Sequence, residues 1–182
     1  VLGIISRSPT DVQPVLDAIV ESAARVCGVD DVLLRLREGN DFVSRAHFGS
    51  IAIARVEISI DEPQVRWVCE HGTLHVPDAK APNGFPVGTS GLFHSFLAVP
   101  LRQQGELIGS LNARRTEVRL FTPAQIKLLE TFADQAVIAL ENVRLFRELG
   151  ERKAELREAL EHQTATAEVL GIISRSPTDV QP

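Results

Sequence analysis

The feature that most constrains the fold is a helix-forming run from Thr122 to about Ala167. Thr122 and Gln125 have the spacing of a capping box, and Pro123 occupies the first helical position, where its missing N–H costs nothing. Apolar residues then recur at steps of three and four, which places them on one stripe that must be buried. They are Ile126, Leu129, Ala133, Ala136, Leu140 and Val143. We therefore predict one very long helix whose first part packs on a folded domain.

The later part of this helix has a different character. Residues 147–161 are charged on almost every side, and the apolar exceptions are Leu149, Leu156 and Leu160. Such a segment cannot pack on a core, but it can pair with a second copy of itself. We therefore predict a parallel homodimer through the first and last helices, in which residues 149–168 form a charged coiled-coil signalling helix.

The spacing of apolar residues changes where this helix would leave the domain. Val143, Phe146 and Leu149 follow one another at steps of three, and a step of three in place of four overwinds a coiled coil locally. Gly150 lies at the same point and lowers helix stability by up to about 1 kcal/mol relative to alanine. This pattern predicts a bistable segment at residues 144–150, which would pass the state of the domain to the next module.

Composition restricts the class of protein. The 182 residues are 44% hydrophobic and carry a formal charge of −5, which is typical of one soluble domain with an extension. No apolar run approaches the ~18 residues of a membrane span and no signal peptide is recognisable, so we expect no membrane contact by this segment. Cys27 and Cys69 lie in apolar stretches, which favours a reducing, cytoplasmic location over a disulfide. Scattered arginines and only 5% aromatic residues argue against nucleic acid as a partner.

The sequence repeats itself at its two ends. Residues 1–14 recur without a change at residues 169–182, and the chain contains no methionine. We therefore expect a piece of a longer protein in which similar modules follow one another, whether by natural duplication or by design. The predicted division is the end of an incoming linker helix at 1–9, a domain at 10–148, the charged coiled coil at 149–168 and the start of a next module at 169–182.

The chain before the long helix alternates between two kinds of pattern. A capping box at Thr10 and Gln13 opens an amphipathic helix that Gly28 closes. Period-two alternation and turn residues then predict the remaining elements. These are a hairpin at 32–48, a strand at 56–60, a short helix at 62–70, a short strand at 74–76, a long loop at 77–91 and a last hairpin at 96–115. The order predicts an α+β fold, with an antiparallel sheet and helices packed on one side.

Several of these segments resemble a known family. They are Leu97–Leu101, Gly105–Gly109, Phe121–Pro123, Phe132–Ala136 and Leu140–Asn142. Together they resemble the C-terminal half of a GAF domain, and they are similar in particular to the tandem GAF modules of bacterial sensor histidine kinases. The resemblance extends over about residues 10–148. It implies a GAF-like sensory domain in a two-component system, which relays a signal through its exit helix to neighbouring modules of the same chain.

The residues that several GAF activities require are missing from this sequence. No histidine stands in a phosphoacceptor box, no Asn-Lys pair of the cyclic-nucleotide type occurs, and Cys69 is followed by Glu70 and not directly by His71, as bilin attachment would need. Trp67, Cys69, His71 and His75 lie close together in the sequence, but a thiol beside Val68 on a short helix is more often a small buried hydrophobe than a metal ligand. We therefore expect no metal, and the sequence names no cofactor.

The resemblance implies where a small molecule would bind. In the family, ligands lie between the sheet and the short helix with its following loop. The candidate ligand-binding residues are then Trp67, His71, Asp78, Asn83, Phe85, Ser90 and His94. Arg114 and Arg115 close the last strand and could meet an anion, although paired arginines more often lie on a solvated surface.

Three classes of function stay open at this point. The first is a sensory module that binds a small molecule, and the second is a purely structural dimerisation and relay unit whose pocket is filled by its own side chains. The third is an enzyme like the GAF-fold reductases of free methionine sulfoxide. Those enzymes need several positioned cysteines, so two cysteines lead us to expect no enzyme and no catalytic residue.

Overall fold

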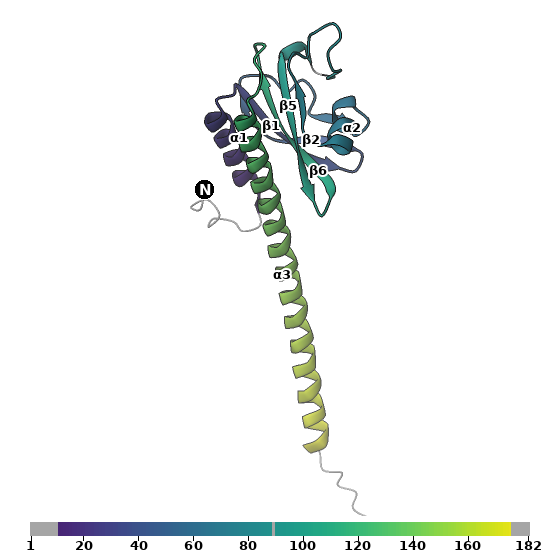
Figure 1. Cartoon of the computed structure of the whole chain (residues 1–182). Coiled ribbons are helices and arrows are strands. Elements are labelled where there is room, and N and C mark those ends of the chain that lie inside the picture. Colours follow the sequence, from purple (N-terminus) through teal and green to yellow (C-terminus); the bar gives the residue numbers. More distant parts are fainter. Residues whose placement is uncertain (1–10, 89, 176–182) are drawn as a thin grey trace, which may run out of the picture.

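The computed structural model describes residues 11–88 and 90–175, with the side chain of Ser90 excepted. Six antiparallel strands form one sheet in the order β3-β2-β1-β6-β5-β4 (Figure 1). The elements are α1 (Gln13–Cys27), β1 (Asp31–Glu38), β2 (Asp41–Gly49), β3 (Glu57–Ser59), α2 (Pro63–His71), β4 (Leu74–Val76), η1 (Ser90–Leu92), β5 (Ser95–Gln103), β6 (Glu106–Arg115) and α3 (Pro123–Arg175). The predicted α+β fold, an antiparallel sheet with helices and a long C-terminal helix, is confirmed, but the helices are not all on one side, because α2 packs on the face opposite α1 and α3.

The last hairpin closes through the shortest turn that fits a twisted sheet. Gln103 pairs with Glu106, so only Gln104 and Gly105 lie between the strands. Both have positive φ, 51° and 86°, as a type I′ turn requires. The turn sets the register in which the side chains of β5 and β6 alternate between the two faces of the sheet.

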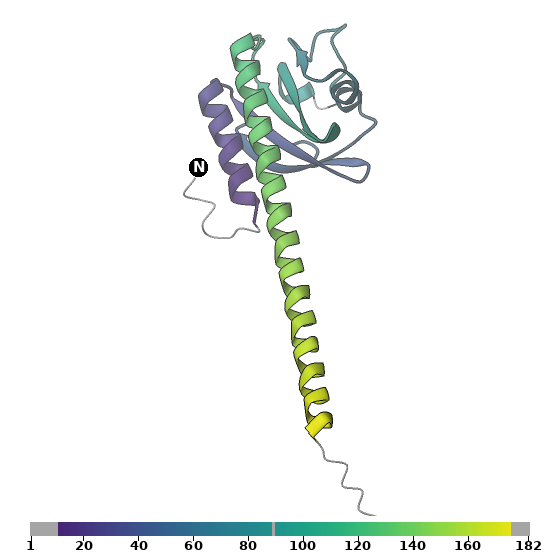
Figure 2. The same ribbon diagram turned by 60° about the horizontal axis from the view of Figure 1, so that its bottom comes forward.

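That alternation divides the core into two layers. Leu97, Val99 and Leu101 of β5 pack with α1 and α3 on one face. The intervening Phe96 and Ala98 pack with α2 and its neighbouring loops on the opposite face. Figure 2 shows α1 and α3 lying along the same side of the sheet, away from α2. The first face is therefore closed by two helices, whereas one short helix and loops cover the second.

The start of α3 is fixed by the predicted capping box. The Thr122 N–H donates to Gln125 Oε1 at 2.9 Å, and the Gln125 N–H donates to Thr122 Oγ1 at 3.2 Å. The Gln125 amide also donates to the Cys27 carbonyl at 2.7 Å, which ties α3 to the end of α1. For α1, Thr10 lies outside the described residues; the helix begins at Gln13, whose N–H donates to Asp11 Oδ1 at 3.0 Å.

Most of α3 extends beyond the domain. The helix has 53 residues, which at 1.5 Å per residue gives a length of about 80 Å. Its buried residues, Leu129, Ala133 and Ala136, all lie in the first quarter, and residues 144–170 are exposed throughout. No helix of the described residues is long and apolar enough to cross a membrane. The predicted linker end at 1–9 lies outside the described residues. Of the predicted start of a next module at 169–182, residues 169–175 continue α3 and the rest lies outside the described residues.

A second apolar stripe follows the opposite side of α3. Four exposed apolar residues of α3, Phe146, Leu160, Val169 and Ile172, lie at e, g or c positions of the heptad register that the other exposed ones define. The other seven fall on the a and d positions of that single register. They are Leu128, Ile138, Leu145, Leu149, Leu156, Leu170 and Ile173. The predicted overwinding at residues 144–150 arose from joining Val143, which faces the domain, to Leu149, which belongs to this second stripe. With the two stripes separated, the spacing is regular and α3 passes through Gly150 as continuous helix.

Candidate functional site

A cavity lies between the sheet and α2. It offers about 30 Å³ to the centres of water-sized molecules. Most of its wall is apolar and comes from α2, five strands and two loops, with Val65, Val68 and Phe96 among the contributors. Its polar members are Arg35, Gln64, Ser110, Asn112 and Arg114. All five are less than a tenth exposed, which is unusual for such side chains and calls for partners.

Strand register brings these polar groups together. On neighbouring strands β1 and β6, Arg35 is directly opposite Ser110, and Asp31 is directly opposite Arg114. Asn112 lies between the two pairs and donates from Nδ2 to Ser110 Oγ at 3.2 Å. Because residues two apart on a strand share a face, the inner face of the central strands carries a continuous row of polar side chains.

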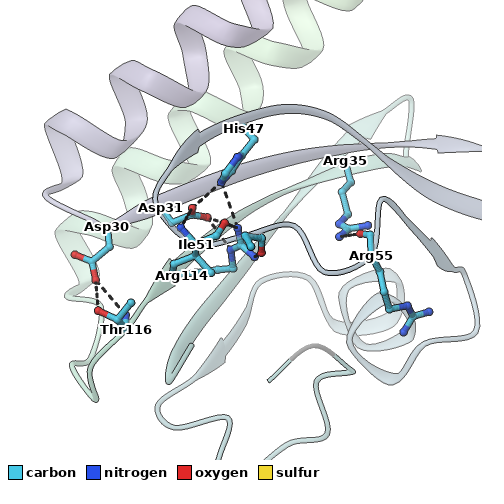
Figure 3. A network of polar contacts seen from close by, with 9 residues as sticks. Asp30, Asp31, Arg35, His47, Ile51, Arg55, Arg114 and Thr116 are labelled. Carbon is cyan, nitrogen blue, oxygen red and sulfur yellow. Dashed lines mark hydrogen bonds and ion pairs between the residues drawn. The ribbon is translucent and has the colours of Figure 1, made fainter. Parts of the chain in front are cut away.

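Asp31 and Arg114 form a fully buried ion pair at one end of this row. Arg114 Nε and Nη2 lie 2.7 and 2.5 Å from Asp31 Oδ1, and both side chains are at most 4% exposed (Figure 3). The other carboxylate oxygen, Oδ2, lies 2.7 Å from His47 Nε2 and accepts from the Ile51 N–H at 3.1 Å. A Cβ on Gly49 would come within 2.5 Å of this oxygen, so the chain needs glycine there. The carboxylate therefore has partners on both of its oxygens, as a buried charge requires.

Arg35 is held in a different way. Its guanidinium donates to the carbonyl oxygens of Phe42 at 3.3 Å, Val56 at 3.1 Å and Arg55 at 2.7 Å. Burial, reinforced by the positive charges of Arg114 and Arg55, lowers the pKa of Arg35 to about 10. Glu62 opposes this shift but forms its own ion pair with Arg55 at 2.6 Å. The arrangement concentrates positive charge beside the cavity.

The two arginines also position the loop that follows β2. Arg114 donates to the carbonyls of Ile51 and Ala52, at 3.0 and 3.3 Å, and Arg35 holds the carbonyls at the other end of the loop. Ala54, at the middle of this loop, lines the cavity. The loop thus forms one wall of the cavity and is fastened by the same side chains that supply its charge.

The predicted ligand-binding residues lie outside this cavity. Trp67 of α2 stacks on His71 with ring centroids 4.3 Å apart and meets Phe85 edge-on at 5.5 Å. Trp67 is 38% exposed, so this aromatic group covers the outer side of α2. The cavity-facing side of the helix carries Gln64, Val65 and Val68 instead.

The predicted polar candidates belong to the long loop. Asp78 Oδ1 lies 2.9 Å from His94 Nδ1, and this hydrogen bond, with a second from the Lys80 N–H, holds the pKa of Asp78 below its usual value. Asn83 lines a shallow outer hollow together with Asp78 and Phe85. The side chain of Ser90 lies outside the described residues. The structure therefore forms two groups from the candidates, Trp67–His71–Phe85 and Asp78–His94, and brings neither into the cavity.

The residues that do line the cavity carried only a weak signal in the sequence. Arg35 sits in an alternating strand, where a charged residue is normally taken to face solvent. Arg114 and Arg115 are 3% and 1% exposed, so the more common assignment of paired arginines to a solvated surface is wrong here. Arg115 points to the other side, donates to the carbonyls of Arg119 and Leu120, and lies 4.4 Å over the Phe121 ring.

Cys27, Cys69 and His75 differ in their surroundings. Burial raises the pKa of Cys27, so its thiol stays protonated inside the helix layer. Cys69 is exposed on α2. Burial lowers the pKa of His75, and its neutral Nε2 accepts from the Phe121 N–H at 3.3 Å. Within the described part of the chain, no three His, Cys, Asp or Glu side chains are grouped to hold a metal.

The sequence profile of the GAF domain family matches residues 11–140, which is most of the folded domain. The chain belongs to the GAF domain family. Among solved structures, it superposes on the GAF domain of an Acinetobacter phosphoenolpyruvate-protein phosphotransferase with a TM-score of 0.66 and 19% identity, covering 79% of this chain and 90% of that one. A fragment of a methyl-accepting chemotaxis protein gives a TM-score of 0.67 at 22% identity, with 79% and 96% covered. No curated protein sequence matches the chain.

The prediction that the chain is not an enzyme needs correction. Its fold is shared with the free methionine-R-sulfoxide reductase of Neisseria meningitidis, solved in complex with its substrate, at a TM-score of 0.66 and 21% identity, with 79% of this chain and 85% of that one covered. This GAF fold therefore supports catalysis in another protein. A count of cysteines could not exclude catalysis here, because activity depends on the geometry of a site and not on the fold or on composition. At this identity the likeness extends to the fold alone.

Proposed function

We propose that this GAF domain is a regulatory module of a signalling protein, of the kind found in bacterial sensor histidine kinases. Two copies pair in parallel along α3, and the state of the domain passes along that helix to the neighbouring modules of the chain. The cavity beneath α2 is the place where a small molecule sets that state. The observation that carries this proposal is the single heptad register of exposed apolar residues on α3.

The exposed part of α3 is too long to be stable as a single helix in a monomer. Residues 144–170 of the helix are exposed throughout, and a helix that buries no apolar face is marginal in water. Leu149 and Leu156 are 64% and 71% exposed, and a second copy in the same register would bury both. The pairing surface is therefore the stripe from Leu128 to Ile173. Leu140, on the first stripe, packs against the domain's own core.

The register also contains the polar residues that specify pairing. Gln135, Asn142 and Gln163 occupy a positions between the leucines. A polar residue at a costs stability but fixes the alignment and the number of strands in a coiled coil. In a parallel pair, Glu148 at g would face Lys153 at e of the other helix, which favours the parallel arrangement.

Light scattering at high micromolar concentration tests the pairing. The chain should have the mass of a dimer, and replacing Leu149 and Leu156 together by Asp should give monomers. Ala154→Asp is the matched control, because Ala154 lies at the outward f position of the same turns and should leave the dimer intact. Trp67 fluorescence should be the same in all three, since the GAF domain itself is unchanged. A wild-type monomer at this concentration would refute the proposal.

A structural relay unit without a ligand is the alternative, and the small size of the cavity is the observation that favours it. Both functions require the same dimer. They differ in whether the cavity takes a molecule from solution, which ligand titration decides.

A further inference from the structure

The charges around the cavity are not balanced. Arg114 has Asp31 as its carboxylate partner, and Arg55 has Glu62. Arg35, which lines the cavity between them, meets only backbone carbonyl oxygens, and within the described residues no carboxylate lies at ion-pair distance from it. A buried guanidinium with no counter-charge is costly, and an anion at this place would offset that cost.

Arg35 also has donors to spare. A guanidinium carries five N–H groups in a rigid plane. The carbonyls of Phe42, Val56 and Arg55 accept three hydrogen bonds from it, so two N–H groups are left for another acceptor. Two donors in the plane of a guanidinium match the two oxygens of a carboxylate-type group.

A second side chain in the same cavity, Gln64, lacks a hydrogen-bond donor rather than an acceptor. Gln64 is 6% exposed and lines the cavity from α2. Its Oε1 is buried and has no hydrogen-bond donor. Buried amide oxygens are nearly always paired, so this atom calls for a donor from whatever occupies the cavity. The cavity therefore presents donors on its sheet side and an acceptor on its helix side.

The size of the cavity limits the occupant. The space of about 30 Å³ compares with the roughly 10–15 Å³ that one water needs on the same measure. It therefore holds two or three waters or one planar group of three or four non-hydrogen atoms. Nucleotides and other large cofactors exceed it.

We propose that this cavity binds a small planar oxyanion of the carboxylate type. Its oxygens accept from Arg35, and an anion with a protonated oxygen also donates to Gln64. The proposal deepens the regulatory function above, since it names the chemical class of the signal. Formate has two carboxylate oxygens for Arg35 but no O–H to donate to Gln64, whereas hydrogen carbonate has both. Comparing the two anions therefore separates the contribution of Arg35 from that of Gln64.

The same contacts would connect the anion to α2 and to the loop that follows β2. Arg35 holds the carbonyls of Arg55 and Val56 at the end of the loop that lines the cavity. Gln64 belongs to α2, which packs on the sheet through Val65 and Val68 and whose end is held by hydrogen bonds from Arg102 of β5 to the Val68 and Cys69 carbonyls. An anion held between Arg35 and Gln64 would therefore fasten α2 and this loop to the sheet.

The test is a titration of the dialysed chain with sodium formate and with sodium hydrogen carbonate, each replacing chloride at constant ionic strength. Trp67 is the single tryptophan and lies one turn beyond Gln64 on the outer side of α2, so its fluorescence reports on changes in α2 when the cavity is filled. We expect saturable changes with both anions and a Tm that rises with anion concentration, as binding to the folded state requires.

Three variants locate the site. Arg35→Met should lower the affinity for both anions at least about tenfold, which is the loss expected for a charge-assisted hydrogen bond. Arg37→Met removes the same charge from an exposed position on the same strand and should change binding less than about twofold. Gln64→Leu should lower the affinity for hydrogen carbonate while leaving the affinity for formate nearly unchanged. If Arg35→Met does not fold, the selective effect of Gln64→Leu still decides the matter.

Two results would overturn the inference. One is the absence of saturable binding by either anion to the wild-type chain, in which case the cavity holds water only. The other is binding that survives Arg35→Met or that Gln64→Leu weakens equally for both anions. In either case a wild-type dimer by light scattering would leave the proposed regulatory pairing standing. A wild-type monomer that still binds the anions would instead refute the proposed pairing and support the proposed anion site.

Discussion

Asp31→Asn tests whether the buried ion pair anchors the site. The substitution keeps the shape of the side chain but removes the charge that compensates Arg114, whose own side chain is only 4% exposed. Removing one partner of a buried pair costs about 3–5 kcal/mol, because the other charge stays buried without compensation. For a domain of this size the loss lowers Tm by on the order of 10–20 °C. The change is large beside the total stability of a typical domain, about 5–15 kcal/mol.

The measurement is urea unfolding followed by Trp67 fluorescence, which reports on the domain and not on the long helix. Glu38→Gln is the matched control, because it makes the same acid-to-amide change at the end of the same strand. Glu38 pairs with Arg45, but both side chains are close to half exposed, so its loss should cost less than about 1 kcal/mol.

A double-mutant cycle separates the pair from the rest of the network. Arg114→Met alone should cost about as much as Asp31→Asn, since it leaves the carboxylate unpaired. The two changes together remove both charges, and we expect them to cost less than the sum by about 2 kcal/mol. The reasoning is refuted if Asp31→Asn costs no more than Glu38→Gln, or if the two substitutions are additive.

Two further substitutions test the loop and the long helix. Asp78→Asn replaces the charged acceptor of the His94 hydrogen bond by a neutral amide oxygen, which weakens that bond, so amide exchange in the 77–91 loop should accelerate at pH 5–7. Because this bond lowers the pKa of Asp78, the difference from wild type should be present above the usual carboxyl pKa of 3.8 and should vanish as the pH falls below it; equal exchange rates at pH 6 would contradict it. Gly150→Ala should stabilise α3 by about 0.5–1 kcal/mol without disturbing the dimer, since a Cβ at this position meets nothing within 4 Å. If Gly150→Ala weakened the dimer, the prediction of a bistable segment at residues 144–150 would be supported after all.

Local signals predicted the elements of the fold well. The capping box at Thr122 and Gln125 forms as expected, and Gly28 ends α1 with φ of 59°. Alternation located the two hairpins, because β1, β2, β5 and β6 each have an apolar face against α1 and α3. These features depend on residues close in the sequence, so spacing alone reveals them.

The candidate site was harder to predict because it depends on strand register. Arg35 and Ser110 are opposite one another only after β1 and β6 pair, and Asp31 meets Arg114 across 83 residues. In the sequence each appears as an isolated polar residue in an alternating strand. The alternation does place these residues on the face away from the helices, but it cannot show that α2 and two loops cover that face.

The two faces of the sheet give the domain a route from the cavity to the helix. On β6, Ser110 and Asn112 line the cavity while Leu111 and Ala113 pack in the layer of α1 and α3. A shift of this strand toward an anion must therefore move both layers, because close-packed interiors transmit displacement. The turn at the end of the same hairpin reaches α3 directly, where Gln103 donates to Glu141 and Arg144 bridges Glu141 to Glu148. These contacts lie where α3 leaves the domain, so a change in the cavity would act on α3 near the end of its first apolar stripe, where the proposed pairing continues through the second stripe alone.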